Sequence, residues 1–296
     1  MKLLKIYNKI LKRIHSITWN GQRSIFMALH EEAISYLLRS HMLRRIAKVI
    51  VSGGKGDKII FLCGCFNSGT TIMRDVLGSH PSIKKTPREG VVYTRLLSDY
   101  EVEEWARCWC ERDRIEEINT VEFSDLSADA LLSDWRFWMP KRGWFLEKSI
   151  ANLARMRQLE KLFPDARFIV ISRDPLPVIE GITRRTKALV ENPNGVYTDN
   201  MAFDQWKLCK DFAEEQVNLL THCHQLTYER FVEAPDVEIN KILNFLDLEP
   251  SASYENPYLR IGDINWQIRN GNQDSIKAVS DERISKIRNR LEINGY

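Results

Sequence analysis

Apolar residues follow two periods along the chain, which predict alternating strands and helices. Short apolar runs at Lys58–Cys63, Trp144–Leu146, Arg167–Ser172 and Gln225–Tyr228 predict strands. Helical spacing occurs at Thr71–Leu77, Ala151–Phe163, Phe203–Leu220 and Val237–Leu246. This order predicts an α/β fold with a parallel sheet flanked by helices on both faces.

The N-terminal part has a different pattern. Apolar residues recur at helical spacing from Leu3 to Ile17, and lysine and arginine fill the other face. Residues 1–56 carry eleven Lys or Arg and two Glu. We expect residues 1–56 to form a basic amphipathic helical extension and residues 57–296 to form the main domain. The extension has two possible roles. It docks on the main domain or on a second subunit of a homodimer, or it binds an anionic membrane surface.

Composition narrows the function classes. A net charge of +3 is too small to indicate a nucleic-acid partner. Six cysteines without metal-type spacing favour a reducing compartment. No N-terminal apolar segment is long enough for a signal core or a membrane span. We therefore expect a cytoplasmic protein, with membrane contact at most peripheral.

One loop carries the main chemical signal. Gly64–Thr71 has the spacing of a phosphate-binding P-loop and lies between a predicted strand and a predicted helix. Backbone N–H groups at such a helix start converge on an anion. Thr70 stands where a nucleoside triphosphatase has its lysine, so the loop suits a ligand with a single phosphate ester there. The alternative is a glycine turn without a ligand.

Several segments, in this order, resemble sulfotransferases that use 3′-phosphoadenosine 5′-phosphosulfate (PAPS), and among them the tyrosylprotein type. The segments are Asn67–Pro81, Glu147–Ser149, Phe168–Pro175, Ile182–Arg184, Tyr228–Val232 and Ile276–Lys277. The resemblance covers most of the chain after residue 57. It implies a sulfuryl transfer from PAPS to an acceptor hydroxyl, without a required metal.

The resemblance also implies residue roles. Asn67, Ser68, Gly69, Thr70 and Thr71 would hold the 5′-phosphosulfate. Arg173 would bind the 3′-phosphate by a charge-assisted contact. Tyr228 and Lys277 match later segments that contact the nucleotide. The alternative from the residues alone is a surface ion pair between Arg173 and Asp174. The resemblance leaves Thr183, Arg184, Tyr228 or Lys277 as further contacts to the 3′-phosphate.

Two residues are candidates for catalysis. The resemblance implies that Lys148 neutralises charge on the bridging oxygen and the sulfate. Glu89 is the candidate general base, nine residues beyond His80, a histidine whose setting indicates a turn. The alternatives are a solvated Lys148 beside Glu147, and a Glu89 that pairs with Arg88 or Lys85.

Two positions depart from the family pattern. Asn67 replaces the usual arginine or lysine of the loop, and Gly181 replaces a serine that helps bind the 3′-phosphate. A nucleotide-binding protein without catalysis therefore stays an alternative, and a P-loop kinase is a less favoured one. The acceptor is open among carbohydrates, lipids, peptides and small metabolites. We expect the insertion Tyr100–Arg142 to cover the acceptor cleft.

Overall fold

The protein is described by a computed structural model. It describes residues 58–86, 88–94, 96–97, 107, 109–111, 126–136, 138–189, 198–250, 258–261, 264–268, 270–277 and 279–296. The expected N-terminal extension, residues 1–56, lies outside this part of the chain, as does most of Tyr100–Arg142. Within the described residues, no helix is long and apolar enough to span a bilayer.

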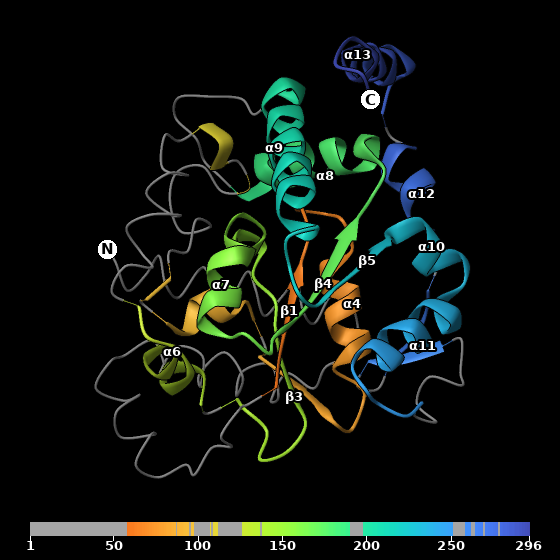
Figure 1. Ribbon diagram of the computed structural model, residues 1–296. Coiled ribbons are helices and arrows are strands. Elements are labelled where there is room, and N and C mark those ends of the chain that lie inside the picture. The colour runs from red at the N-terminus through yellow and green to blue at the C-terminus, as the bar shows by residue number, and fades with distance from the viewer. Residues whose placement is uncertain are drawn as a thin grey trace, which may run out of the picture.

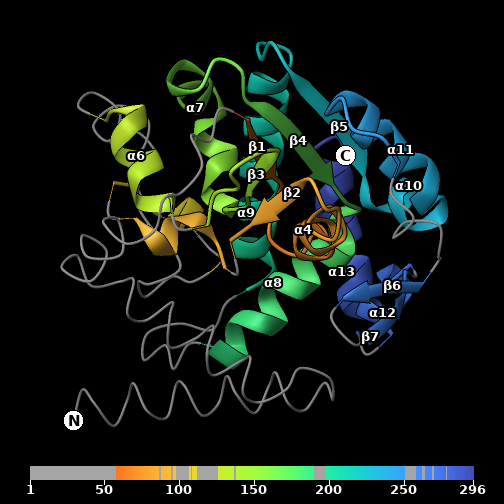
Figure 2. The same ribbon diagram turned by 90° about the horizontal axis from the view of Figure 1, so that it is seen from below.

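A five-stranded, fully parallel sheet forms the centre of the fold, and the apolar runs predicted four of its strands, all but β2 (Ile83–Lys85). Its strands are β1 (Ile59–Cys63), β2 (Ile83–Lys85), β3 (Trp144–Glu147), β4 (Arg167–Ser172) and β5 (Cys223–Thr227). Their order in the sheet is β2-β3-β1-β4-β5, with β2 and β5 at the two edges (Figure 2). The central strand β1 is paired on both sides, and Phe61 lies between Glu147 and Phe168. The carboxyl ends of all five strands therefore point to one side, where ligands bind in open α/β sheets.

Both faces of the sheet are buried. Phe61 and Cys63 of β1 pack into the core on one face, and Ile60 and Leu62 pack into the core on the other. One face is covered by α6 (Ala128–Trp135), α7 (Met156–Leu162), α8 (Pro175–Leu189) and α9 (Asp199–Val217). The other is covered by α4 (Thr70–Leu77), α10 (Tyr228–Glu233) and α11 (Pro235–Phe245). Figure 1 shows α7 and α9 on one side of the sheet and α4 and α11 on the other.

Smaller elements complete the fold. The described residues include three 3₁₀ segments, η1 (Gly90–Tyr93), η2 (Trp109–Glu111) and η3 (Ile150–Arg155). An antiparallel pair, β6 (Tyr258–Ile261) and β7 (Ile264–Gln267), precedes α12 (Asn272–Ile276) and α13 (Asp281–Ile293). Helix α12 packs against α8, which brings residues from near the C-terminus to the carboxyl edge of the sheet.

Several element boundaries differ from the sequence-based expectation, and two of the differences have a clear local cause. The expected strand Gln225–Tyr228 ends at Thr227, because the Thr227 hydroxyl accepts a hydrogen bond from Arg230 N at 3.2 Å and caps α10. Tyr228 is thus the first residue of a helix. The expected helix Ala151–Phe163 is divided into η3 and α7, and Asn152 N donates to Ser149 O at 3.1 Å, a bond of the 3₁₀ type.

Candidate functional site

The loop between β1 and α4 has the backbone of an anion cradle. Gly69 has φ of 95°, and a Cβ added to it would lie 2.6 Å from Cδ2 of Tyr228, so only glycine fits. The first helical bond runs from Met73 N to Gly69 O at 3.0 Å. The start of α4 has neither an acidic residue nor a side-chain cap. Its first N–H groups, those of Thr70 and Thr71 among them, therefore lack an intrahelical acceptor.

A cavity of about 680 Å³ opens at this loop, and its wall is rich in cations. Its cationic side chains are Arg74, Arg88, Arg107, Lys148, Arg173, Arg184 and Arg185. Among the described residues that line it, Asp75 and Glu89 are the acidic ones. The carboxylate of Asp75 is bound by Arg74 at 2.9 Å and by Lys85. The cavity therefore has a large positive excess, which favours a ligand with several negative charges.

Arg173, just beyond the end of β4, is held from three sides. Its Nη1 donates to Asn67 O at 2.7 Å, its Nε donates to Asn272 Oδ1 at 2.7 Å, and its Nη2 lies 3.4 Å from Ser275 Oγ. The guanidinium carbon lies 4.1 Å from the ring centroid of Tyr228, a cation–π contact. Burial lowers the pKa of Arg173 from its ordinary value. These contacts join the phosphate loop, β4 and α12 at one guanidinium.

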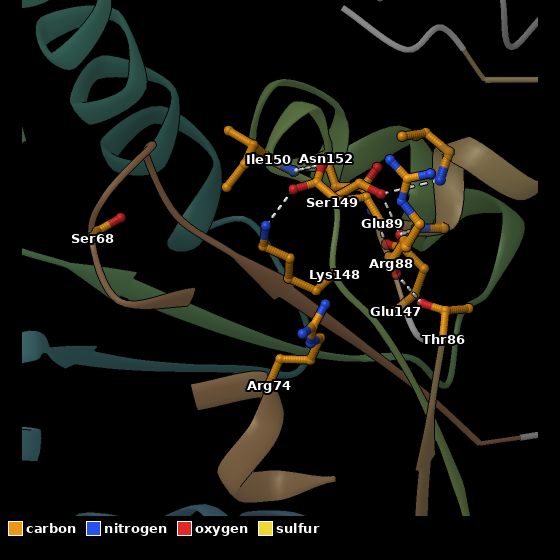
Figure 3. Close-up of polar contacts among 12 residues, drawn as sticks. Ser68, Arg74, Thr86, Arg88, Glu89, Glu147, Lys148, Ser149, Ile150 and Asn152 are labelled. Carbon is orange, nitrogen blue, oxygen red and sulfur yellow. Dashed lines mark hydrogen bonds and ion pairs between the residues drawn. The ribbon is translucent and has the colours of Figure 1, made fainter. Parts of the chain in front are cut away.

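Lys148 and Glu89, the two catalytic candidates, form an ion pair in the same cavity. The Lys148 ammonium donates to Glu89 Oε1, and Ile150 N donates to Glu89 Oε2 at 3.3 Å (Figure 3). The Lys148 side chain is 7% exposed and that of Glu89 is 17% exposed. Lys148 is therefore not the solvated lysine of the alternative interpretation.

A buried polar network around Glu147 lies next to the Lys148–Glu89 pair. Glu147 is fully buried, and its carboxylate accepts hydrogen bonds from Gly90 N at 2.7 Å, from the Ser149 hydroxyl and from the Asn152 amide (Figure 3). Burial raises the pKa of Glu147 to about 7, and the nearby Glu89 carboxylate contributes in the same direction. Because Gly90 directly follows Glu89, the network fixes the backbone that carries the candidate base.

Most of the residues expected at the site meet in this cavity. Asn67, Gly69, Thr70, Thr71, Glu89, Lys148, Arg173 and Tyr228 line it. Ser68 does not; its hydroxyl donates to Cys65 O, and the residue lines a second hollow on the α9 side of the loop. Lys277 is also outside the lining, and its exposed ammonium pairs with Asp274 at 2.9 Å. The roles of Ser68 and Lys277 stay predictions.

Several cations of the cavity were not expected from the sequence. Arg185 follows Gly181 by four residues in α8, so both lie on the helix face that lines the cavity. Burial lowers the pKa of Arg185, and the neighbouring charges of Arg107, Arg184 and Arg173 lower it further. A helical interpretation of residues 175–189 would have indicated Arg185. Nothing in the local sequence indicates Arg107, because it reaches the cavity from a distant segment.

Comparisons with known proteins agree with the resemblance described above. The sequence profile of the sulfotransferase family matches residues 59–252. Protein-tyrosine sulfotransferase 1 of Danio rerio is 25% identical over 242 residues, which cover 78% of this chain and 66% of that protein. Protein-tyrosine sulfotransferase 1 of Homo sapiens is 32% identical over 125 residues, covering 40% of this chain and 32% of that protein.

The fold is also shared with solved structures. The sulfotransferase domain from the curacin biosynthetic pathway superposes with a TM-score of 0.51 at 20% identity and covers 79% of this chain and 97% of that one. For the sulfotransferase domain of the Synechococcus PCC 7002 olefin synthase, the TM-score is 0.50 at 18% identity, with 82% and 97% covered. At this identity the likeness shows the fold alone. The profile match covers well over half of the chain, and the chain therefore belongs to the sulfotransferase family.

Proposed function

We propose that this protein transfers a sulfuryl group from PAPS to an acceptor hydroxyl. The observation that carries the proposal is the Glu89–Lys148 ion pair, which shares one cavity with the phosphate loop and Arg173. A proton acceptor, a cation for the leaving group and two anion-binding places are the parts that such a transfer requires.

The cavity suits the nucleotide in size and charge. A volume of about 680 Å³ falls in the range of small-molecule sites, which is roughly 300–1,000 Å³. PAPS carries a phosphosulfate at the 5′ position and a phosphate at the 3′ position. The start of α4 would bind the first group and Arg173 the second, because both line the same cavity.

Lys148 would act on the leaving side of the reaction. During transfer, a bond forms between the acceptor oxygen and sulfur, and the bond between sulfur and the bridging oxygen breaks. Negative charge then grows on the bridging oxygen of the departing adenosine 3′,5′-bisphosphate. A nearly buried ammonium stabilises that charge more strongly than one in water, because few water molecules screen it.

Glu89 would act on the acceptor side. The acceptor hydroxyl must lose its proton as its oxygen attacks sulfur, and the Glu89 carboxylate would receive that proton. The bond from Ile150 N and the network around Glu147 hold Glu89 in place. This positioning is what a general base needs for a short, aligned proton transfer.

The acceptor class is proposed from the relatives. Those compared above are named protein-tyrosine sulfotransferases, which puts phenolic hydroxyls of tyrosine peptides first among the acceptors to test. Carbohydrates, lipids and small metabolites follow. A screen with labelled PAPS against these four classes would identify the acceptor by the class that takes up label.

A second candidate function is nucleotide binding without catalysis. It is favoured by Asn67 in place of a loop cation and by the Ser68 hydroxyl, which bonds to Cys65 O rather than facing the cavity. Calorimetry with adenosine 3′,5′-bisphosphate and with ATP–Mg²⁺ would test the nucleotide class, and a preference for ATP–Mg²⁺ would support the kinase alternative. Turnover of PAPS with any acceptor would exclude the purely binding protein.

The compartment and the partners of residues 1–56 are separate proposals. We propose a cytoplasmic protein, and the free thiols of Cys63, Cys65, Cys110, Cys209 and Cys223 support a reducing compartment. Cosedimentation with anionic vesicles would test peripheral membrane contact of the extension. Sedimentation velocity would test the homodimer.

A further inference from the structure

The backbone of Asn67 is fixed in an unusual conformation. Its φ is 61°, in the left-handed region where asparagine is tolerated better than most residues. Its carbonyl accepts a hydrogen bond of 2.7 Å from Nη1 of Arg173. The loop residue that replaces a cation is therefore tied directly to the arginine expected to bind the ribose-side phosphate.

The side chain of Asn67 lacks partners. Both Nδ2 and Oδ1 are shielded from water and have no hydrogen-bond partner in the described part of the chain. A buried amide without partners is unfavourable, because it has lost its bonds to water and gained none. Asn67 also lines the cationic cavity. A rotation of the side chain toward this cavity would expose Nδ2, and a phosphate oxygen there would supply the missing acceptor.

Gly181 is the neighbour of this carboxamide. A Cβ added to Gly181 would lie 2.9 Å from Cγ, 3.0 Å from Nδ2 and 3.2 Å from Cβ of Asn67. These separations are shorter than carbon contacts of about 3.5–4.0 Å. Glycine is less favourable than alanine inside a helix such as α8. The space occupied by Asn67 gives a physical reason for a glycine at this position.

The neighbours of Asn67 indicate which part of the ligand its side chain would contact. The carboxamide lies against α8, and the face of α8 that carries Gly181 also brings Arg184 and Arg185 to the cavity. Arg173 is bound to the Asn67 carbonyl. Asn67 thus belongs to the arginine-rich end of the cavity.

We propose that Asn67 and Gly181 form a matched pair that sets nucleotide selectivity. The Asn67 carboxamide donates to the phosphate on the ribose, and Gly181 leaves the room for it. This inference rests on the proposed function, and it assigns Asn67 to the phosphate opposite to the one that the family resemblance implied. The two departures from the family pattern are then one compensated change.

The test compares adenosine 3′,5′-bisphosphate with adenosine 5′-monophosphate by titration calorimetry on the full chain. Asn67→Gly removes the carboxamide and keeps the left-handed backbone accessible. We expect the affinity for the bisphosphate to fall about tenfold, the effect of one hydrogen bond to a charged group. The affinity for the monophosphate should stay within about twofold. Asn67→Asp keeps the shape of the side chain but its negative charge repels a phosphate, so it should weaken binding of the bisphosphate further.

Gly181 variants test the pairing. Gly181→Ala should lower the affinity for the bisphosphate when Asn67 is present, because the new Cβ displaces the carboxamide. In the Asn67→Gly background the same change should have no further effect, which is a coupling that independent sites lack. In that background, Gly181→Ser should restore part of the affinity through its hydroxyl. Asn289→Ala, at an exposed position of α13, is the matched control, and thermal melts verify that each variant folds.

Two results would overturn the pair. One is an equal loss of affinity for both nucleotides in Asn67→Gly. The other is a loss of bisphosphate affinity in the double variant that equals the sum of the two single losses in free energy. Failure of the proposed function is distinguishable, because the unmodified protein would then bind neither nucleotide or would prefer ATP–Mg²⁺. An unmodified protein that prefers the bisphosphate, together with an Asn67→Gly variant that keeps this preference, would exclude the pair alone.

Discussion

The Lys148 ammonium donates a hydrogen bond to the Glu89 carboxylate, although 59 positions separate the two residues in the chain. Lys148 directly follows β3, and Glu89 directly precedes η1. Parallel pairing of β2 with β3 brings these two segments to the same edge of the sheet. A base candidate and a cation candidate are thus placed together by the sheet itself, which makes their separate roles testable by substitution.

Glu89→Gln should keep nucleotide affinity and lose turnover. The amide keeps the size of the side chain but cannot accept the acceptor proton, so we expect kcat to fall about 10²–10⁴-fold. Labelled-sulfate transfer measures turnover, and calorimetry with adenosine 3′,5′-bisphosphate measures binding. Glu233→Gln, at an exposed position of α10, is the control. Unchanged turnover in Glu89→Gln would remove Glu89 from the role of base.

Arg173→Ala should weaken nucleotides that carry a 3′-phosphate far more than those that lack it. A lost charge-assisted contact is expected to reduce affinity for adenosine 3′,5′-bisphosphate by about 10- to 100-fold. Adenosine 5′-monophosphate serves as the comparison ligand. Arg288→Ala, at an exposed position of α13, should change neither affinity. Equal losses for both nucleotides in Arg173→Ala would contradict the assignment.

Gly69→Ala should damage the phosphate loop more than backbone strain alone explains. A left-handed φ costs a residue with a Cβ about 1–2 kcal/mol, and at Gly69 the Cβ would also meet the Tyr228 ring. Gly295→Ala is a matched control, because Gly295 has φ of 80° but nothing within 4 Å of an added Cβ. We expect a larger fall in Tm, and a loss of nucleotide binding, for Gly69→Ala. Equal effects of the two changes would show that the contact with Tyr228 is unimportant.

Glu147→Gln should change how stability depends on pH. Burial raises the pKa of Glu147 from 4.5 to about 7, so the folded protein binds more protons than the unfolded chain between these values. The free energy of unfolding therefore falls as pH rises from about 4.5 to about 7. This decrease in the free energy of unfolding is roughly 3 kcal/mol in full, and Glu147→Gln should abolish the decrease.

The measurement is urea unfolding at pH 4.5, 6 and 8 for the unmodified protein and for Glu147→Gln. Glu292→Gln, at an exposed position near the C-terminus, should behave as the unmodified protein does. A pH dependence that persists unchanged in Glu147→Gln would show that Glu147 is not the titrating group.

Four strands of the sheet followed from the sequence, because buried parallel strands are continuous apolar runs. Most of the residues expected at the site line one cavity, while their roles stay predictions. Periodicity could not reveal β2, since Ile83–Lys85 has three residues and a single buried side chain. The orientation of the Ser68 hydroxyl was also out of reach. The spacing of the loop places Ser68 near a ligand, but only the local fold decides that it bonds to Cys65 O.

The contact between Asn67 and Gly181 shows a different limit. Each residue was visible in the sequence as a separate departure from the family pattern. They lie 114 positions apart, and only the packing of α8 on the loop brings them within reach. A single sequence gives the identity of such residues, whereas their coupling depends on long-range packing.

The grip on Arg173 has a consequence for synthesis on the ribosome. All strands of the central sheet are complete by Thr227, but Asn272 and Ser275, which hold the guanidinium, follow it by 45 and 48 positions. A nascent chain can therefore complete its sheet before Arg173 has its contacts with Asn272 and Ser275. We expect the nascent protein to bind its ligand only after Asn272 and Ser275 have left the ribosome and can contact the arginine.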